Sequence, residues 1–271
     1  MAALRPGAVG DTLAVTSPLS AVSPMWTGLQ YRVLRWIAPV EPSHMDGSAY
    51  VNRSKLEVLL GNALFEEVRG KDVLDFGCGA GAEAVELAQV ARSVYGLDIN
   101  EKLLAQARIR AASSGVGDRC AFGTSPPADR VDVIVSLDSF EHFADPAAVL
   151  DVMYDVLRPG GRVVTSFGPT WYHPYGGHLF SVFPWAHLVF SERALIRWRS
   201  DIRSDGATRF AEVEGGLNQM TIARFEQIAH ASRFRTVRIE AVPIRKLSRL
   251  HSRPLREFTT AIVRAVLERP T

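Results

Sequence analysis

Residues 73–88, VLDFGCGAGAEAVELA, carry the strongest signal for secondary structure in this chain. Its first four residues are apolar except for Asp75, which is typical of a strand that is buried on both faces. Glycines follow at alternate positions, namely Gly77, Gly79 and Gly81. Glycine is needed where the backbone takes a positive φ or passes close to a ligand. A helix is expected to begin near Ala80, so that its free N–H groups and positive dipole end face whatever binds over the glycines.

The glycine turn by itself is compatible with two kinds of nucleotide site. Gly77-x-Gly79-x-x-Ala82 fits the relaxed dinucleotide-binding fingerprint, which would indicate an NAD-dependent oxidoreductase. Asp75 favours the other kind, because a carboxylate at the mouth of the strand suits a ligand with an ammonium group better than a pyrophosphate. With this carboxylate, D-F-G-C-G-A-G resembles motif I of the class I S-adenosylmethionine-dependent methyltransferases. A plain glycine turn in another α/β protein is the remaining alternative.

Length and composition indicate a globular protein. The chain has 271 residues, of which 47% are hydrophobic and 22% are charged, so it can bury one substantial core with an added lid. A net charge of +2 gives no reason to expect nucleic acid as a partner. Two cysteines do not make a disulfide framework, and no apolar run is long enough to span a membrane. The N-terminus lacks the apolar core of a signal peptide, so a cytoplasmic location is expected by default; the oligomeric state stays open.

A second strand, residues 93–97, ends at Asp98. A carboxylate about 20 residues beyond the glycines holds the ribose hydroxyls in α/β nucleotide sites. Asp98 would serve S-adenosylmethionine and a dinucleotide equally well, and Ile99 could cover one face of the adenine. Asp98 could also cap the helix that begins near Glu101, although Asn100 is better placed as the cap.

A third short strand, residues 119–123, ends in a departure from the related methyltransferases. Those enzymes have Gly-Asp-Ala here, and their Asp accepts a hydrogen bond from the adenine amino group. This chain has Gly123-Thr124-Ser125. The Thr124 hydroxyl can accept the same hydrogen bond, but more weakly than a carboxylate.

The features after the fourth strand are the most specific part of the resemblance. This strand, residues 131–136, leads into the loop LDSFEHF, residues 137–143. A helix begins at Pro146, a Pro-Gly-Gly turn ends it, and a fifth strand covers residues 162–167. The order resembles that of small-molecule methyltransferases, including the ubiquinone-biosynthesis O-methyltransferases. The resemblance implies that Leu137 and its neighbours lie along S-adenosylmethionine.

The loop also bears on the acceptor. Methyltransferases of adenine or glutamine commonly carry Asn-Pro-Pro-aromatic here, and this chain does not, so those acceptors are disfavoured. Glu141 and His142 are expected to brace the loop rather than to act in catalysis, since polar loop residues usually satisfy backbone groups.

Residues 169–220 are expected to bind the acceptor, because they start at the carboxyl edge of the sheet, where open α/β sheets bind ligands. Aromatic residues there are the expected pocket walls: Trp171, Tyr172 and Tyr175, with Phe180, Phe183 and Trp185. His173 and His178 are the candidates for a catalytic general base, and His187 is the third histidine of the segment. Their spacing matches no compact zinc signature, so no metal is expected. The apolar run 179–190 could instead contact a membrane surface.

Five segments are expected along the chain. They are a disordered tail (1–24), N-terminal lid helices (25–70), the S-adenosylmethionine-binding core (71–168), the substrate-side insert (169–220) and the C-terminal part of the sheet (221–271). A short amphipathic helix is expected in residues 25–42, either as a lid or as a strap across a sheet face, and one helix is expected in residues 55–67.

The last stretch, residues 257–269, fits both a helical stripe and a strand. Its β-branched residues favour a strand, and the resemblance implies a seventh, antiparallel strand at this place. The basic connection before it, residues 243–256, is either a solvated loop or a site for an anionic group of the substrate.

The predicted fold is therefore α/β, a Rossmann-like, mostly parallel sheet of seven strands with helices on both faces. The expected reaction is methyl transfer from S-adenosylmethionine to a small apolar or aromatic acceptor, at a hydroxyl oxygen. The alternatives are an N- or C-methyltransferase of a small molecule or lipid, and a non-catalytic protein that binds S-adenosylmethionine.

Overall fold

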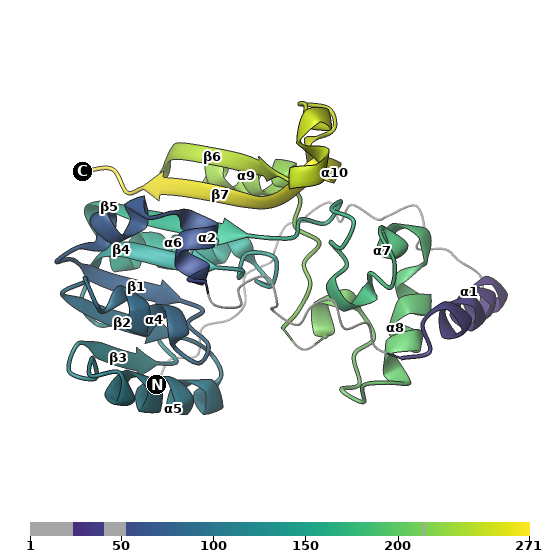
Figure 1. Cartoon of the computed structure of the whole chain (residues 1–271), viewed down its shortest axis with the longest axis horizontal. Coiled ribbons are helices and arrows are strands. Elements are labelled where there is room, and N and C mark those ends of the chain that lie inside the picture. The colour runs from purple at the N-terminus through teal and green to yellow at the C-terminus, as the bar shows by residue number, and fades with distance from the viewer. Residues whose placement is uncertain (1–23, 41–52, 214) are drawn as a thin grey trace, which may run out of the picture.

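The chain folds around one seven-stranded sheet, and the computed structural model describes residues 24–40, 53–213 and 215–271. The strand order is β3-β2-β1-β4-β5-β7-β6, with helices on both faces of the sheet (Figure 1). β7 runs antiparallel to β5 and β6, and the other strand pairs are parallel. The predicted fold class is confirmed. Most of the expected disordered tail lies outside the described residues.

The strands follow the apolar runs of the sequence. They are β1 (Asp72–Phe76), β2 (Ser93–Leu97), β3 (Cys120–Gly123), β4 (Val131–Leu137), β5 (Leu157–Phe167), β6 (Arg235–Pro243) and β7 (Thr260–Glu268). The ambiguous last stretch is the antiparallel strand that was expected. β5 begins earlier than the predicted residue 162, because Leu157 already pairs with Val131 before the register shifts at the Pro-Gly-Gly turn.

Helices cover the sheet on two faces. One face carries α2 (Lys55–Leu60), α3 (Ala63–Val68), α4 (Ala82–Leu87) and α5 (Glu101–Ser113), and the other carries α6 (Pro146–Val156) and α9 (Ile222–Ala231). The prediction of a single helix over residues 55–67 is wrong, because the chain forms two helices there. Gly61 ends α2 with a φ of 83°, which favours glycine, and α3 starts two residues later. α4 begins at Ala82 rather than Ala80, since Gly81 at its N-cap has a φ of 75°.

A second body of structure lies beyond the carboxyl ends of the parallel strands (Figure 1). We call it the outer lobe: α1 (Pro24–Ile37) together with residues 169–213 and 215–220. It contains α7 (Ala186–Val189), α8 (Glu192–Ser200) and the short 3-10 helices η2 (His178–Phe180) and η3 (Phe210–Glu212). Its own apolar core includes Leu34, Leu195 and Trp198, whose side chains are buried.

α1 is a part of this outer lobe and packs on α8. Tyr31 Oη and Arg35 Nη1 donate hydrogen bonds to Asp201 Oδ2 at 2.8 and 2.9 Å, and Trp198 Nε1 donates to the carbonyl of Ala38 at 2.6 Å. The helix expected in residues 25–42 is thus present, but it is not a strap across a face of the sheet. Among the described residues, no helix is long and apolar enough to span a bilayer.

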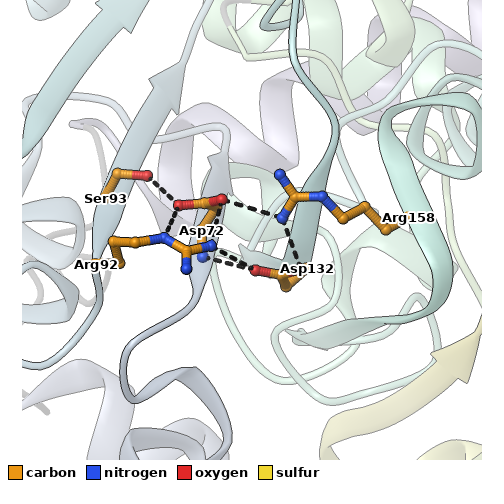
Figure 2. A network of polar contacts seen from close by, with 5 residues as sticks. All are labelled: Asp72, Arg92, Ser93, Asp132 and Arg158. Atoms are coloured by element: carbon orange, nitrogen blue, oxygen red, sulfur yellow. Dashed lines mark hydrogen bonds and ion pairs between the residues drawn. The ribbon is translucent and has the colours of Figure 1, made fainter.

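The amino ends of four strands are joined by an ion-pair network, opposite the outer lobe (Figure 2). Asp72 accepts hydrogen bonds from Arg92 at 2.7 and 2.6 Å, from Ser93 at 2.8 Å and from Arg158 at 3.0 Å. Asp132 accepts from Arg158 at 2.6 Å. The hydrogen bonds from Arg92, with those from Ser93 and Arg158, hold the pKa of Asp72 well below its usual range. The network thus belongs to the framework of the sheet.

Candidate functional site

The three glycines of the turn between β1 and α4 have positive φ angles, but the space beside them differs. Their φ angles are 87° at Gly77, 50° at Gly79 and 75° at Gly81. A Cβ atom on Gly77 would lie 2.7 Å from Ser139 Oγ, and one on Gly81 would lie 2.6 Å from Ala107 Cβ. A Cβ on Gly79 would have no neighbour within 4 Å. Gly79 is therefore the position at which a ligand can approach the backbone most closely.

Asp98 is tied directly to this turn. The backbone N–H of Gly79 donates to Asp98 Oδ2 at 2.9 Å, and that of Asn100 donates to Oδ1 at 2.8 Å. Asn100 caps α5, as expected, by accepting from the backbone of Lys102 and Leu103. Each oxygen of Asp98 keeps a further lone pair, which suffices for two vicinal hydroxyls.

Asp75 lies at the end of β1 and is almost fully buried, with 3% of its surface exposed. Its Oδ2 atom has no hydrogen-bond partner among the described residues. Burial, together with the nearby carboxylates of Glu83 and Asp98, raises the pKa of Asp75 to about 8. A cation close to Oδ2 would lower this pKa and be stabilised by the carboxylate.

The other predicted cofactor residues end neighbouring strands. Thr124 follows β3 and is exposed, Ile99 follows β2 with 95% of its surface exposed, and Leu137 ends β4 and is buried. Since β3, β2, β1 and β4 are adjacent and parallel, the fold brings all of these positions to one edge of the sheet. An exposed isoleucine beside Asp98 is apolar surface that a flat ring could cover.

Lys55 is a residue of this region that sequence reasoning missed. Its Nζ atom lies 2.9 Å from Asp138 Oδ2 and 4.0 Å from Glu83 Oε1, so the first turn of α2 bridges α4 and the loop after β4. Asp138 has a φ of 46°, which is uncommon for a residue other than glycine. No motif marks Lys55, because its partners are distant in the sequence.

Glu141, His142 and Asn218 fix the loop after β4. Glu141 Oε1 accepts from the backbone of Gly168 at 3.1 Å, and His142 Nδ1 lies 2.8 Å from the Gly216 carbonyl. Asn218 Nδ2 donates to the carbonyls of Phe140 and Phe143 at 2.6 and 2.7 Å, and these two hydrogen bonds complete the anchoring of the loop. The expected bracing role of Glu141 and His142 is confirmed by these contacts. Burial raises the pKa of Glu141 to about 8.

The two candidate catalytic histidines lie in different surroundings. The His178 ring lies 5.2 Å from the ring of His142, between centroids, so it reaches the loop after β4. His173 Nδ1 instead accepts from the backbone of Tyr175 at 3.0 Å. Burial lowers the pKa of both His173 and His178 to about 4. The third histidine, His187, contacts Ser181 Oγ and the Trp171 carbonyl inside the outer lobe.

Glu141, His142 and His178 could together hold a metal ion, because each places one potential ligand atom within 4.8 Å of the other two. The sequence gives no sign of this set, since two of its members come from the loop after β4 and only one from the insert. The expectation that the protein needs no metal stays a prediction.

The aromatic residues of the insert divide between structural and accessible positions. Trp171 packs against His187 and Phe210, with ring centroids 4.7 and 5.6 Å away. Tyr172 packs against Phe258 of α10 (Arg256–Thr259), and Tyr175 is 36% exposed. The prediction that Phe180 lines the pocket is wrong, because its side chain is buried in the core of the outer lobe. The acceptor-binding role of Trp171, Tyr172 and Tyr175 stays a prediction.

Sequence comparison identifies relatives of the region around this site. Residues 74–165 match the family described as "Methyltransferase domain". The ubiquinone biosynthesis O-methyltransferase of Pseudomonas aeruginosa (strain LESB58) is 38% identical over 102 residues, which are 36% of this chain and 44% of that protein. The corresponding enzyme of Aeromonas salmonicida (strain A449) is 36% identical over 102 residues, 36% of this chain and 43% of the enzyme. The chain thus matches less than half the length of these relatives.

Solved structures share the fold over most of the chain. The S-adenosylmethionine-dependent methyltransferase of Mesorhizobium loti aligns with a TM-score of 0.52 and 20% identity, over 83% of this chain and all of that one. The [4+2]-cyclase SpnF aligns with a TM-score of 0.51 and 16% identity, over 77% of this chain and 80% of the cyclase. At such identities the likeness is one of fold.

Proposed function

We propose, from the membership of residues 74–165 in the class I S-adenosylmethionine-dependent methyltransferases, that this chain methylates a hydroxyl oxygen of a small apolar or aromatic acceptor. S-adenosylmethionine is the methyl donor of that family. The observation that carries the proposal is that Asp75 and Asp98 lie at the ends of adjacent strands beside the turn of Gly79, with Asp75 Oδ2 unpaired and open space at the Cβ position of Gly79.

Each group at this edge matches one part of the donor. The unpaired oxygen of Asp75 would accept a hydrogen bond from the donor's ammonium group, and Asp98 would accept from the ribose hydroxyls. Ile99 offers apolar surface to the adenine. Leu137 ends β4, on the other side of β1 from Asp98. The Thr124 hydroxyl, directly after β3, would make a polar contact with the donor. An ionised Asp75 would repel a pyrophosphate, whereas the ammonium group of the donor would stabilise that carboxylate.

Methyl transfer itself makes few chemical demands on the protein. The acceptor oxygen attacks the methyl carbon, the bond from carbon to sulfur breaks, and its electron pair returns to sulfur to leave S-adenosylhomocysteine. The protein holds the three atoms in line and receives the hydroxyl proton on a general base. We assign the base to His178 rather than His173, because His178 lies against the loop after β4, next to the predicted donor site.

His178 is suited to this role in one respect and limited in another. Its lowered pKa keeps the ring neutral at pH 7, so the ring can accept a proton. A base with a pKa of about 4 is weak toward an ordinary alcohol, so the acceptor hydroxyl is expected to be acidic, as a phenol is. The names of the two relatives, both O-methyltransferases, support oxygen as the methylated atom.

The proposal is tested in two steps. Calorimetric titration with S-adenosylhomocysteine and, in parallel, with NAD identifies the cofactor, and binding of NAD alone would overturn the proposal. A panel of phenols, alcohols, amines and peptides is then assayed for S-adenosylhomocysteine formation. Turnover of phenols that is lost in His178→Asn and kept in His173→Asn is the expected result.

A non-catalytic or differently acting protein is the second candidate. The fold is shared with a protein described as a [4+2]-cyclase, so the fold alone does not decide the reaction. Donor binding without turnover of any acceptor in the panel would favour this candidate.

A further inference from the structure

The outward face of α1 carries a continuous apolar stripe. Its side chains recur at helical spacing, and each is between 37% and 86% exposed: Met25, Trp26, Leu29, Val33, Trp36 and Ile37. Val40, just beyond the helix, continues the stripe and is 71% exposed. Single exposed apolar residues are ordinary on a protein surface, but a contiguous row of this size marks an interaction site.

The stripe is held in place, because the opposite side of α1 is part of the outer lobe's core. Leu34 is fully buried there. Gln30 Oε1 accepts from both the backbone N–H and the hydroxyl of Ser191 at 3.0 and 2.7 Å. The helix therefore presents a fixed apolar face to the outside.

Arginines lie beside the stripe, on α1 itself and on the adjoining helix α8. α1 contains two arginines, Arg32 and Arg35, and no acidic residue. Two exposed arginines of α8 lie one turn apart on the side next to α1, since Arg197 stacks on the Tyr31 ring at 4.2 Å and Arg193 precedes it by four residues. The carboxylate of Asp201 also lies nearby. It accepts hydrogen bonds from Tyr31 and Arg35, so the charge of Arg35 balances the negative charge of Asp201.

We propose that α1, with the adjoining edge of α8, binds the surface of a lipid bilayer that carries anionic headgroups. Apolar and aromatic side chains on one face and arginines at its margins are the pattern of a helix that lies in the interface. Trp26 and Trp36 are ten residues apart, so they stand about 15 Å from each other along the axis, and tryptophan favours the headgroup level. The neighbouring arginines select anionic lipid over a neutral surface.

Surface binding is independent of the proposed reaction, because the stripe lies on the outer lobe and uses none of the residues assigned to the donor. If the proposed function also holds, α1 would bring the acceptor side of the protein to a bilayer, where an apolar phenol would be concentrated. The two proposals therefore fail separately: donor binding tests the first, and vesicle binding tests the second.

The test is co-sedimentation of the full chain with vesicles of phosphatidylcholine alone, and of phosphatidylcholine mixed with phosphatidylglycerol. We expect binding to the mixed vesicles, a blue shift of tryptophan emission on binding, and weaker binding as salt is raised. The double variant Leu29→Gln/Trp36→Gln should weaken binding more than about tenfold. Arg32→Gln and Arg193→Gln should each weaken it about fivefold, and Arg32→Lys should retain it.

Matched controls separate this result from damage to the fold. Ile109→Gln removes an apolar side chain that is 67% exposed on α5, far from α1, and should leave vesicle binding unchanged. All variants should keep the circular dichroism spectrum and melting temperature of the parent. Vesicle binding that is absent, or equally strong in Leu29→Gln/Trp36→Gln, overturns the proposal. A dimer that becomes a monomer in this variant, without vesicle binding, assigns the stripe to a second copy of the chain instead.

Discussion

The charge of Asp75, in the proposed donor site, changes with pH near neutrality. Its folded pKa of about 8 lies above the ordinary value, so the stability that it contributes is complete below about pH 4 and is lost as pH rises toward 8. Binding of a donor with an ammonium group would lower this pKa again, because the ammonium group stabilises the ionised carboxylate. Binding below pH 8 is therefore coupled to ionisation of Asp75.

We predict that S-adenosylhomocysteine binding at pH 7 releases a proton, which calorimetry in buffers of different ionisation enthalpy can count. Asp75→Asn should abolish this release and weaken binding about ten- to a hundredfold, since a charge-assisted hydrogen bond is lost. Its unfolding free energy should also lose the part of the pH dependence between about pH 4 and 8 that Asp75 supplies, at most about 1.4 kcal/mol per pH unit. Unchanged proton release in this variant would contradict the assignment.

Gly79 and Gly81 should respond differently to the same substitution. Both have positive φ, so alanine is strained at either place, but only at Gly81 does the new Cβ meet a close neighbour, Ala107, at 2.6 Å. Gly81→Ala should lower the melting temperature more than Gly79→Ala does. Gly79→Ala should lose more affinity for S-adenosylhomocysteine relative to its loss of stability. The reverse order in calorimetry and thermal melts would show that Gly79 does not face the ligand.

At the scale of elements, the loop after β4 is the joint between the sheet and the outer lobe. Asn218 anchors it through hydrogen bonds to two carbonyls, those of Phe140 and Phe143. Asn218→Ala would leave both carbonyls without this donor, and we expect a loss of about 1–3 kcal/mol in unfolding free energy, measured in urea. The exposed neighbour Gln219 is the control, and Gln219→Ala should cost much less. Equal losses would mean that the loop does not depend on Asn218.

The strands could be predicted well because their signals are local. Apolar runs, the glycine turn and Pro146 each specify structure within a few residues, and the first five strands start or end within a few positions of their predicted bounds. The break at Gly61 was missed, because an isolated glycine inside a helical pattern is compatible with a continuing helix.

Contacts between distant elements could not be predicted in the same way. α1 packs against α8, which lies more than 150 residues away in the sequence. The pattern of an amphipathic helix indicates that one face is buried, but not which element covers that face. His178 meets His142 for the same kind of reason, since the path of the insert decides which of its histidines returns to the sheet. Phe180 could not be assigned to a core or to a pocket, because aromatic side chains in these two places have no distinguishing pattern in the sequence.

At the scale of the whole molecule, the network in Figure 2 predicts the response to acid. The pKa of Asp72 is lowered by Arg92, Ser93 and Arg158, so its contribution to stability is present above about pH 4 and is lost as pH falls. Asp72→Asn should lower the unfolding free energy at pH 7 by about 1–3 kcal/mol and flatten the acid limb of the stability curve. Asp151→Asn, at an exposed site on α6, is the control. An unchanged acid limb in Asp72→Asn would contradict the role of the network.

The separate core of the outer lobe predicts that it can open without the sheet. Trp198 is 1% exposed within this core and donates to the Ala38 carbonyl. Trp198→Ala should destabilise the outer lobe by about 3–5 kcal/mol, through the lost contacts and the cavity that remains. Hydrogen exchange should then rise in α1 and α8 while β1 and β4 stay protected. Equal deprotection of β1 and β4 would show that the two cores unfold together.

The position of β7 has a consequence for synthesis on the ribosome. β7 follows β6 in the chain, yet it lies between β5 and β6 in the sheet, and β6 pairs with β7 alone among the described strands. Until residues 260–268 emerge, β5 has an open edge and β6 has no strand to join. A nascent chain stalled before this point would expose strand edges with unpaired backbone N–H and C=O groups. Such edges can pair with other chains and are bound by chaperones. The sheet can therefore be completed only after residues 260–268 have been synthesised, when β7 pairs with both β5 and β6.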